Sequence, residues 1–184
     1  MDFNDHSLLE GSHAFLSPSK HHWLNYTEDK LDQAYYSALS AQRGTEMHDL
    51  AHQLIRLRVK LPDIPKTLNM YVNDAIGFQM KTEQILFYSV NCFGQVDAIA
   101  FRNNKLRIAD LKTGITPASE HQLEVYAAIF CLEYKVNPLA IEIELRLYQN
   151  DQVTVFHTDP DVIVHAMDKI RVFDKRIRQI REEL

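Results

Sequence analysis

The spacing of hydrophobic residues divides the chain into a helical first part and a second part in which strands and helices alternate. Apolar residues recur every three or four positions from Met47 to Val59, which predicts an amphipathic helix after Gly44. Ser17 followed by Pro18 predicts the start of an earlier helix, because a hydroxyl cap and a proline at the first helical position suit a helix N-terminus. Two further helices are predicted, over residues 29–39 and 66–80.

From residue 84 onwards the hydrophobic period shortens to that of strands. Apolar, β-rich runs predict strands over residues 84–90, 95–101 and 105–112. Asn103 and Asn104 lie between the last two runs and tolerate the positive φ of a tight hairpin turn. A helix over residues 117–134, a second hairpin over 140–148 and 153–156, and a closing helix over 160–181 complete the prediction.

This order of elements predicts an α/β fold with a mixed β-sheet flanked by helices and an N-terminal helical segment. A chain of 184 residues is long enough for one domain with a single core. We therefore expect one domain over residues 1–184. Its expected parts are a helical N-terminal part (about 17–80), a catalytic core (about 81–157) and a C-terminal helix (about 160–182).

Composition and charge narrow the functional classes. The net charge of −5 argues against a protein that coats nucleic acid, although six basic residues and one acid lie between Lys169 and Arg181. That run is typical of a solvated helix face, and it would also suit contact with a phosphate backbone. The two cysteines, Cys92 and Cys131, are too few for a disulfide framework or a cysteine-ligated cluster. With no signal peptide and no long apolar run, the sequence predicts a cytoplasmic protein without a membrane partner.

Two acids and a lysine in the apolar strands form the first candidate for chemistry. Asp97 lies in an apolar strand, and Asp110 shares one strand face with Ile108 and Lys112. If adjacent antiparallel strands bring the acids together, they repel each other when ionised. Oxygen ligands of this kind suit Mg²⁺ or Mn²⁺. These residues alone leave a second interpretation open, in which Lys112 forms a buried ion pair with one of the acids.

Three residues outside the strands converge on the same region. Gln122 and Tyr126 are four positions apart and project from one face of the predicted helix, within reach of the strand that carries Asp110. His48 lies beside the apolar stripe of its own helix. A lone histidine in this position is commonly a half-buried residue bonded to a carbonyl, and an amide near a tyrosine is a common surface pair.

Four short motifs together resemble a known family. The chain contains Gly44-x-x-x-His48, Gly94-x-x-Asp97, Asp110-x-Lys112-Thr113-Gly114 and Gln122-x-x-x-Tyr126, in this order. The order resembles that of PD-(D/E)XK nucleases in the RecB-like, phage-type exonuclease branch. The resemblance covers about residues 16–126 and implies a restriction-endonuclease-like core.

The resemblance also implies roles for individual residues. His48, Asp97 and Asp110 would be ligands of Mg²⁺ or Mn²⁺, with the backbone carbonyl of Leu111 completing the set. Lys112 would position and polarise the attacking water. Gln122 and Tyr126 would order the site and contact the DNA backbone. Glu83 would have a supporting role. DNA would also be contacted by Ser17, Ser19 and Thr113.

Two departures from the family pattern refine the expectation. Val96 stands where the family has proline, which leaves the acid after it unchanged. Two cysteines cannot hold the four-cysteine iron–sulfur cluster of some relatives. The resemblance therefore implies a cluster-free DNA exonuclease of recombination, repair or phage DNA metabolism, in a bacterial or phage-infected cell. Its expected partners are DNA, a single-strand annealing protein, a helicase or another recombination subunit, and further copies of the chain.

Two other functions stay open on the sequence alone. His48-Asp49-x-x-His52 has the spacing of the zinc-protease helix, although its acid is one methylene shorter and no third ligand is evident. The chain could also be a weak or inactive nuclease-fold protein that binds DNA or regulates a larger complex, since a fold does not determine a function.

Overall fold

The computed structural model describes residues 14–114 and 116–183. Residues 1–13, on which the expected absence of a signal peptide rests, lie outside the described residues. The chain falls into two compact units, Met1–Arg43 and Gly44–Leu184, and their boundary lies inside the predicted helical N-terminal part. Among the described residues, no helix combines the length and hydrophobicity that crossing a membrane requires.

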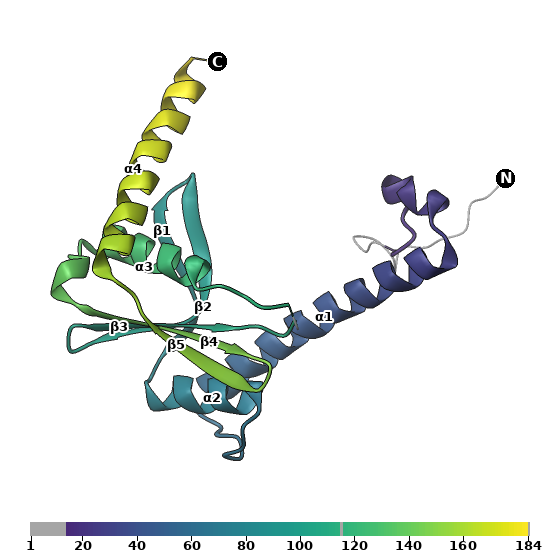
Figure 1. The fold of residues 1–184 in the computed structure, drawn as a ribbon, viewed down its shortest axis with the longest axis horizontal. Helices are drawn as coiled ribbons and strands as arrows, with labels where there is room; N and C mark the ends of the chain where they lie inside the picture. The colour runs from purple at the N-terminus through teal and green to yellow at the C-terminus, as the bar shows by residue number, and fades with distance from the viewer. Residues whose placement is uncertain (1–13, 115, 184) are drawn as a thin grey trace, which may run out of the picture. The chain divides into compact units, whose positions relative to one another are not determined.

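Helix α1 (Glu28–Arg56) follows a short 3-10 helix, η2 (Pro18–Asn25) (Figure 1). The sequence predicted two helices where α1 is one, because we treated Gly44 as a break. A single glycine costs a helix only about 1 kcal/mol, which the packing of buried Ala51 and Ile55 offsets. The helix ends at Arg56, three residues earlier than predicted, because Arg58 takes the left-handed conformation (φ 57°) and Val59 N–H bonds back to the Leu54 carbonyl.

The second unit is built on a five-stranded mixed sheet, which confirms the predicted α/β class. Its strands lie in sequence order across the sheet. Pairing is antiparallel from β1 to β3, parallel between β3 and β4, and antiparallel between β4 and β5. The elements are α2 (Thr67–Gly77), β1 (Lys81–Ser89), β2 (Cys92–Arg102), β3 (Lys105–Leu111), α3 (His121–Tyr134), η3 (Pro138–Ala140), β4 (Glu142–Gln149), β5 (Gln152–His157) and α4 (Pro160–Glu182).

The first hairpin turn has the predicted backbone, and the second has the same conformation. Asn103 and Asn104 have φ values of 50° and 57°, and Asn150 and Asp151 have 51° and 57°. These short polar side chains tolerate the left-handed region, so each pair can reverse the chain between two strands.

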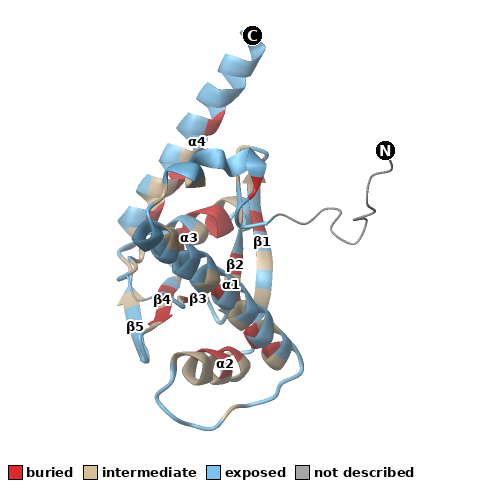
Figure 2. Ribbon diagram, turned by 90° about the vertical axis from the view of Figure 1, so that its right-hand side faces the viewer, coloured by how far each residue is buried: buried red, intermediate tan, exposed pale blue. Residues whose placement is uncertain are grey.

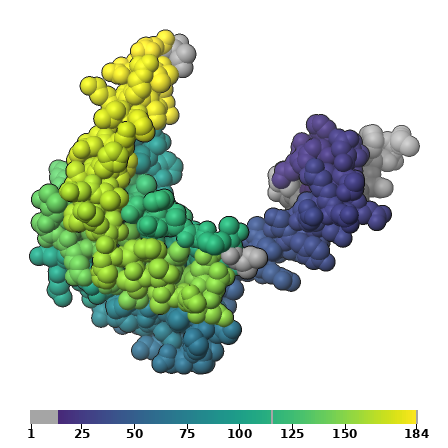
Figure 3. All heavy atoms as spheres, viewed as in Figure 1, coloured from purple at the N-terminus to yellow at the C-terminus, as the bar shows by residue number. Residues whose placement is uncertain are grey.

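The sheet is covered on both faces (Figure 2). Alternation along β3 sends Leu106 and Ile108 into a core with α3 and α4, and sends Ala109 and Leu111 into a core with α1 and α2. Asp110 therefore belongs to the α3 face, at the end of the strand. In Figure 3 the C-terminal end of α4 extends beyond the rest of the second unit.

Candidate functional site

Asp97 and Asp110 lie where the pairing of β2 with β3 ends. The last paired residues are Ala98 and Ala109, so Asp97 comes one residue before this pair on β2 and Asp110 comes one residue after it on β3. Asp97 Oδ2 accepts a hydrogen bond of 2.8 Å from the Leu111 N–H. The Asp97 side chain thus replaces a backbone hydrogen bond between the strands and holds the backbone of β3 at Leu111.

Asp110 is buried and lies against Lys112. The carboxyl-bearing residue is 4% exposed, and Lys112 Nζ lies 3.1 Å from Oδ1 and 3.0 Å from Oδ2. The ammonium donates its hydrogen bond to Oδ1, whereas Oδ2 forms an ion pair with it but is shielded from solvent and accepts no hydrogen bond. A buried carboxylate oxygen without a hydrogen bond is costly, which leaves this oxygen able to accept a further cationic ligand.

Gln122 and Tyr126, both on α3, extend the hydrogen-bond network of Lys112. Lys112 Nζ donates to Gln122 Oε1 at 2.9 Å, and Gln122 Nε2 lies 3.4 Å from the Tyr126 hydroxyl. That hydroxyl donates to the Gln95 carbonyl on β2 at 2.6 Å. The structure therefore brings the lysine, the amide and the tyrosine into one chain of hydrogen bonds from β3 to β2.

Glycines of the first two motifs allow close packing at this site. A Cβ on Gly94 would lie 2.9 Å from Tyr126 Cε1, and a Cβ on Gly44 would lie 2.7 Å from Thr113 Oγ1. Both distances are shorter than ordinary contact. The motif glycines therefore give Tyr126 and Thr113 the room that they occupy.

Gly94→Ala is expected to destabilise the protein by about 1–3 kcal/mol, because the new methyl group meets the Tyr126 ring and displaces its hydroxyl from Gln95. Urea unfolding would measure this loss. Gly77→Ala is the matched control, since nothing lies within 4 Å of its Cβ and alanine favours a helix. Equal stability of the two variants would contradict the proposed packing.

His48 faces Asp97 from α1. Its Nδ1 lies 3.6 Å from Asp97 Oδ2, and both side chains are partly exposed. Burial raises the pKa of Asp97, and Asp110 raises it further, while the Leu111 N–H, His48 and Lys112 oppose this rise. Burial and the charges of Asp97 and Asp110 also raise the pKa of Tyr71. The two acids therefore make the region more negative than its histidine and lysine balance.

The donor set fits a divalent metal ion in chemical type. His48 offers a nitrogen, Asp97 and Asp110 offer carboxylate oxygens, and Asp110 Oδ2 is unbonded. These ligand atoms are not gathered into a compact group, because the Leu111 N–H and Lys112 hold the two carboxylates. Within residues 14–114 and 116–183, the compact group of three potential ligands is instead Glu120, His121 and Glu124, which the sequence did not suggest.

His52 has partners that differ from those of His48. Its Nδ1 lies 2.5 Å from Thr82 Oγ1 and 3.8 Å from Glu83 Oε2, on β1. Glu83 has a φ of 53°, a strained value for this residue type. In the part of the chain that the structure describes, no compact group of three ligands contains either histidine, so the zinc-peptidase alternative gains no support.

The remaining candidates are Thr113 in the second unit and Ser17 and Ser19 in the first. Thr113 is exposed beside Lys112. Ser17 and Ser19 belong to the first unit, where their hydroxyl oxygens lie 2.8 Å apart and the Trp23 indole N–H donates to the Ser17 carbonyl.

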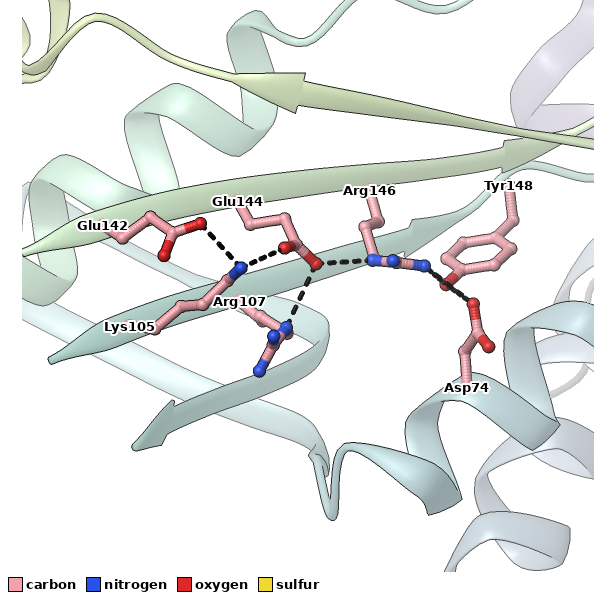
Figure 4. A network of polar contacts seen from close by, with 7 residues as sticks. All are labelled: Asp74, Lys105, Arg107, Glu142, Glu144, Arg146 and Tyr148. Atoms are coloured by element: carbon pink, nitrogen blue, oxygen red, sulfur yellow. Dashed lines mark hydrogen bonds and ion pairs between the residues drawn. The ribbon is translucent and has the colours of Figure 1, made fainter. Parts of the chain in front are cut away.

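A network of charged residues connects β3, β4 and α2, and the sequence analysis did not predict it (Figure 4). Buried Glu144 lies 2.6 Å from Lys105 Nζ, 3.1 Å from Arg107 Nε and 2.7 Å from Arg146 Nε. Burial alone would raise its pKa, but hydrogen bonds from these three cations lower the pKa of Glu144 to about 2.

The network reaches the site through Tyr148. Its hydroxyl donates to Asp74 Oδ2 at 2.7 Å, and Asp74 also pairs with Arg146 at 2.8 Å (Figure 4). The Tyr148 carbonyl accepts the Lys112 N–H at 2.9 Å. The alternation Glu-x-Glu-x-Arg in β4 beside Lys-x-Arg in β3 is the sequence signal for this network.

Comparisons of the chain with protein-family models, with curated proteins and with solved structures find no match. The geometry and the sequence motifs therefore carry the functional argument.

Proposed function

We propose that the chain is a Mg²⁺- or Mn²⁺-dependent deoxyribonuclease with a restriction-endonuclease-like core, of the RecB-like PD-(D/E)XK type. The observation that carries the proposal is the buried Oδ2 of Asp110, which has no hydrogen bond, lies 3.0 Å from Lys112 Nζ and is accompanied by Asp97 on the neighbouring strand. Excess negative charge with one adjacent ammonium is the arrangement that a metal-assisted phosphodiesterase needs.

The sheet supports the same proposal. An antiparallel β1–β2–β3 unit leads through α3 to a parallel β4, and the acids lie on β2 and β3 next to the point where the pairing of these strands stops. The resemblance implies this order of elements around the catalytic acids. The motifs with Asp97, Asp110 and Gln122 thus lie on β2, at the end of β3 and on α3, in the order that the resemblance implies.

In the proposed mechanism, His48, Asp97, Asp110 and the Leu111 carbonyl would hold the metal ion. Its chemistry there would be to lower the pKa of a water molecule and to polarise the phosphoryl oxygen. Lys112 keeps its ammonium between Asp110 and Gln122, where it orients the attacking water and offsets negative charge on the phosphate. Tyr126 and Gln122 hold Lys112 in place and offer polar atoms to the DNA backbone, as does Thr113.

The biological setting belongs to the same proposal. An exonuclease in recombination, repair or phage DNA metabolism would act on DNA with a single-strand annealing protein, a helicase or another recombination subunit, in the cytoplasm. Ser17 and Ser19 of the first unit would add contacts to DNA.

One observation favours a second candidate, a nuclease-fold DNA-binding or regulatory subunit with little activity. Lys112 pairs with Asp110 at 3.0 Å, so the buried carboxylate is partly neutralised without a metal ion. In that case the site would bind DNA and would not hydrolyse it.

Digestion of end-labelled linear DNA and closed circular DNA with Mg²⁺ or Mn²⁺ tests the proposal. We expect metal-dependent loss of the linear substrate and an intact circle, as an exonuclease requires a DNA end. Cleavage of both would establish an endonuclease. No cleavage of either substrate would contradict the proposal and favour the binding subunit.

Mn²⁺ is expected to raise the melting temperature of the wild-type protein, because an ion that binds only the folded state stabilises it. At a Mn²⁺ concentration 100 times the Kd the gain is about 2.7 kcal/mol. Thermal denaturation with increasing Mn²⁺ would measure it. Asp110→Asn should remove the shift, whereas Glu124→Gln, in the compact group on α3, should keep it. The reverse result would place the metal ion at Glu120, His121 and Glu124.

A further inference from the structure

Two adjoining cavities lie beside β1 in the second unit. The larger, about 420 Å³, is lined by the end of α1, the end of α2 and the start of β1. The smaller, about 240 Å³, is lined by the same start of β1, the end of β2 and α3. They share four lining residues, Gln79, Lys81, Gln84 and Arg102. We call them the edge cavities.

The edge cavities lie where the outer strand of the sheet is shorter than its neighbour. Lys81, the first residue of β1, pairs with Ile99, so residues 100–102 of β2 continue beyond β1. A strand that extends past its neighbour leaves backbone groups and side chains accessible at the sheet edge. The cavities occupy the two faces of this step.

The larger cavity is strongly basic. Arg56, Arg58, Lys81 and Arg102 all line it, and neither cavity has a carboxylate in its lining. Among the described residues, none of these four cations forms an ion pair, and Arg102 donates only to the neutral Gln79 amide. The protein is acidic overall, with a net charge of −5, yet these four cations are grouped in a cavity that no acid lines. This arrangement favours binding of an anion from outside the protein.

The smaller cavity adds aromatic surface to this charge. Phe130 lies between Phe101 and Tyr134, with ring centroids 5.2 Å and 4.9 Å away. Phe101 is 40% exposed and Tyr134 is 52% exposed. Cations along a groove beside exposed aromatic rings are the combination that holds single-stranded nucleic acid, through its phosphates and its bases respectively.

The edge cavities lie close to the candidate site along α1 and β2. His52, one helical turn after His48, lines the larger cavity. On β2, Arg102 follows Asp97 by five residues, or about 16 Å of strand. A stacked strand rises about 3.4 Å per nucleotide, so this distance corresponds to about four or five nucleotides.

We propose that the edge cavities bind a single strand of nucleic acid, four or five nucleotides from the phosphate held at Asp97 and Asp110. Its phosphates lie among Arg56, Arg58, Lys81 and Arg102, and a base lies against Phe101 and Tyr134. The inference rests on the proposed function, since it takes the phosphate at the two acids as the point of cleavage.

Binding of a fluorescent 20-nucleotide single strand to an Asp110→Asn background protein tests the proposal without cleavage. Fluorescence anisotropy is measured over a range of NaCl concentrations. Arg56→Gln with Arg102→Gln is expected to weaken binding at least tenfold at 100 mM NaCl. It should also make the slope of log K against log [NaCl] shallower by about 1.4, because each lost phosphate contact contributes about 0.7.

The matched control is Lys60→Gln with Lys66→Gln, in the segment between α1 and α2. This pair removes the same charge from exposed positions that line neither cavity. We expect less than a twofold change in its affinity. Equal weakening by both pairs would show general charge attraction and would overturn the proposal.

A second measurement tests the aromatic contact. A single 2-aminopurine is moved along the oligonucleotide, and we expect quenching of its fluorescence at one or two positions that Tyr134→Leu abolishes. Tyr36→Leu, at an exposed tyrosine of the first unit, is the control. Unchanged quenching in Tyr134→Leu would overturn base stacking there.

Competition distinguishes a nucleic-acid strand from a small anion. Inorganic phosphate at 10 mM should displace little of the oligonucleotide, and full displacement would overturn a strand site. If Arg56→Gln with Arg102→Gln left binding of the oligonucleotide unchanged while the wild-type protein cleaved DNA, only the strand site at the edge cavities would be refuted. Binding that depends on the edge cavities, in a protein that cleaves no DNA, would refute the proposed hydrolysis and leave the strand site in place.

Discussion

Asp110→Asn is expected to abolish DNA cleavage and to leave the fold intact. The amide has the shape of the carboxylate but lacks its charge, so a metal ion would lose its most buried ligand. Folding should tolerate the change because the amide oxygen of asparagine can still accept the hydrogen bond from Lys112 Nζ, and loss of a buried charge removes an unfavourable desolvation term. Gel assays of linear DNA with Mg²⁺ would measure the activity, and circular dichroism would verify the fold.

Lys112→Met tests the other half of the same pair. We expect cleavage to fall by about 10²–10³-fold, the usual loss when one charge-stabilising group is removed from an active site. Binding of DNA should persist, since most of the affinity comes from other contacts with phosphates. This result would separate a chemical role for Lys112 from a purely structural ion pair with Asp110.

Asp49→Asn is the matched control for both substitutions. Asp49 is an exposed acid on α1, next to His48 in sequence, and it would be the general base of a zinc peptidase. Full nuclease activity is expected in this variant. If Asp110→Asn or Lys112→Met also kept full activity, the assignment of the catalytic site would be wrong.

Local pattern was sufficient to predict most elements and the faces of the strands. Alternation placed Asp110 and Lys112 on one side of β3, and Gln122 and Tyr126 follow the helical spacing that brings both to Lys112 and Gln95. These relations lie within one element or between sequential neighbours. Sequence spacing is therefore informative about them.

Relations between distant segments could not be predicted in the same way. Gly44 looked like a helix break because its role, close approach to Thr113, depends on a segment that lies 69 residues later. The cations of the edge cavities come from α1, β1 and β2, and no local pattern connects them. Glu144 meets Lys105 and Arg107 only through the parallel pairing of β3 with β4.

Glu144→Gln is expected to lower the free energy of unfolding by about 3 kcal/mol at pH 7. The pKa of Glu144 falls from 4.5 to about 2 in the folded protein, and each pKa unit corresponds to about 1.4 kcal/mol. Glutamine would leave Lys105, Arg107 and Arg146 without their shared carboxylate at a buried position. Urea unfolding followed by circular dichroism would measure the loss.

Glu142→Gln is the matched control, because Glu142 also pairs with Lys105 at 2.6 Å but has a side chain that is 55% exposed. An exposed pair of this kind contributes about 1 kcal/mol or less. A loss as large as that of Glu144→Gln would mean that burial does not distinguish the two acids. A loss below 1 kcal/mol for Glu144→Gln would mean that the network does not hold β3 against β4.

The dependence on pH separates the charge of Glu144 from its shape. Because its folded pKa lies below the ordinary value, the stabilisation is complete above pH 4.5 and is lost as the pH falls towards 2. The difference between wild type and Glu144→Gln should therefore be about 1 kcal/mol smaller at pH 3.5 than at pH 7. A difference independent of pH would assign the effect to packing.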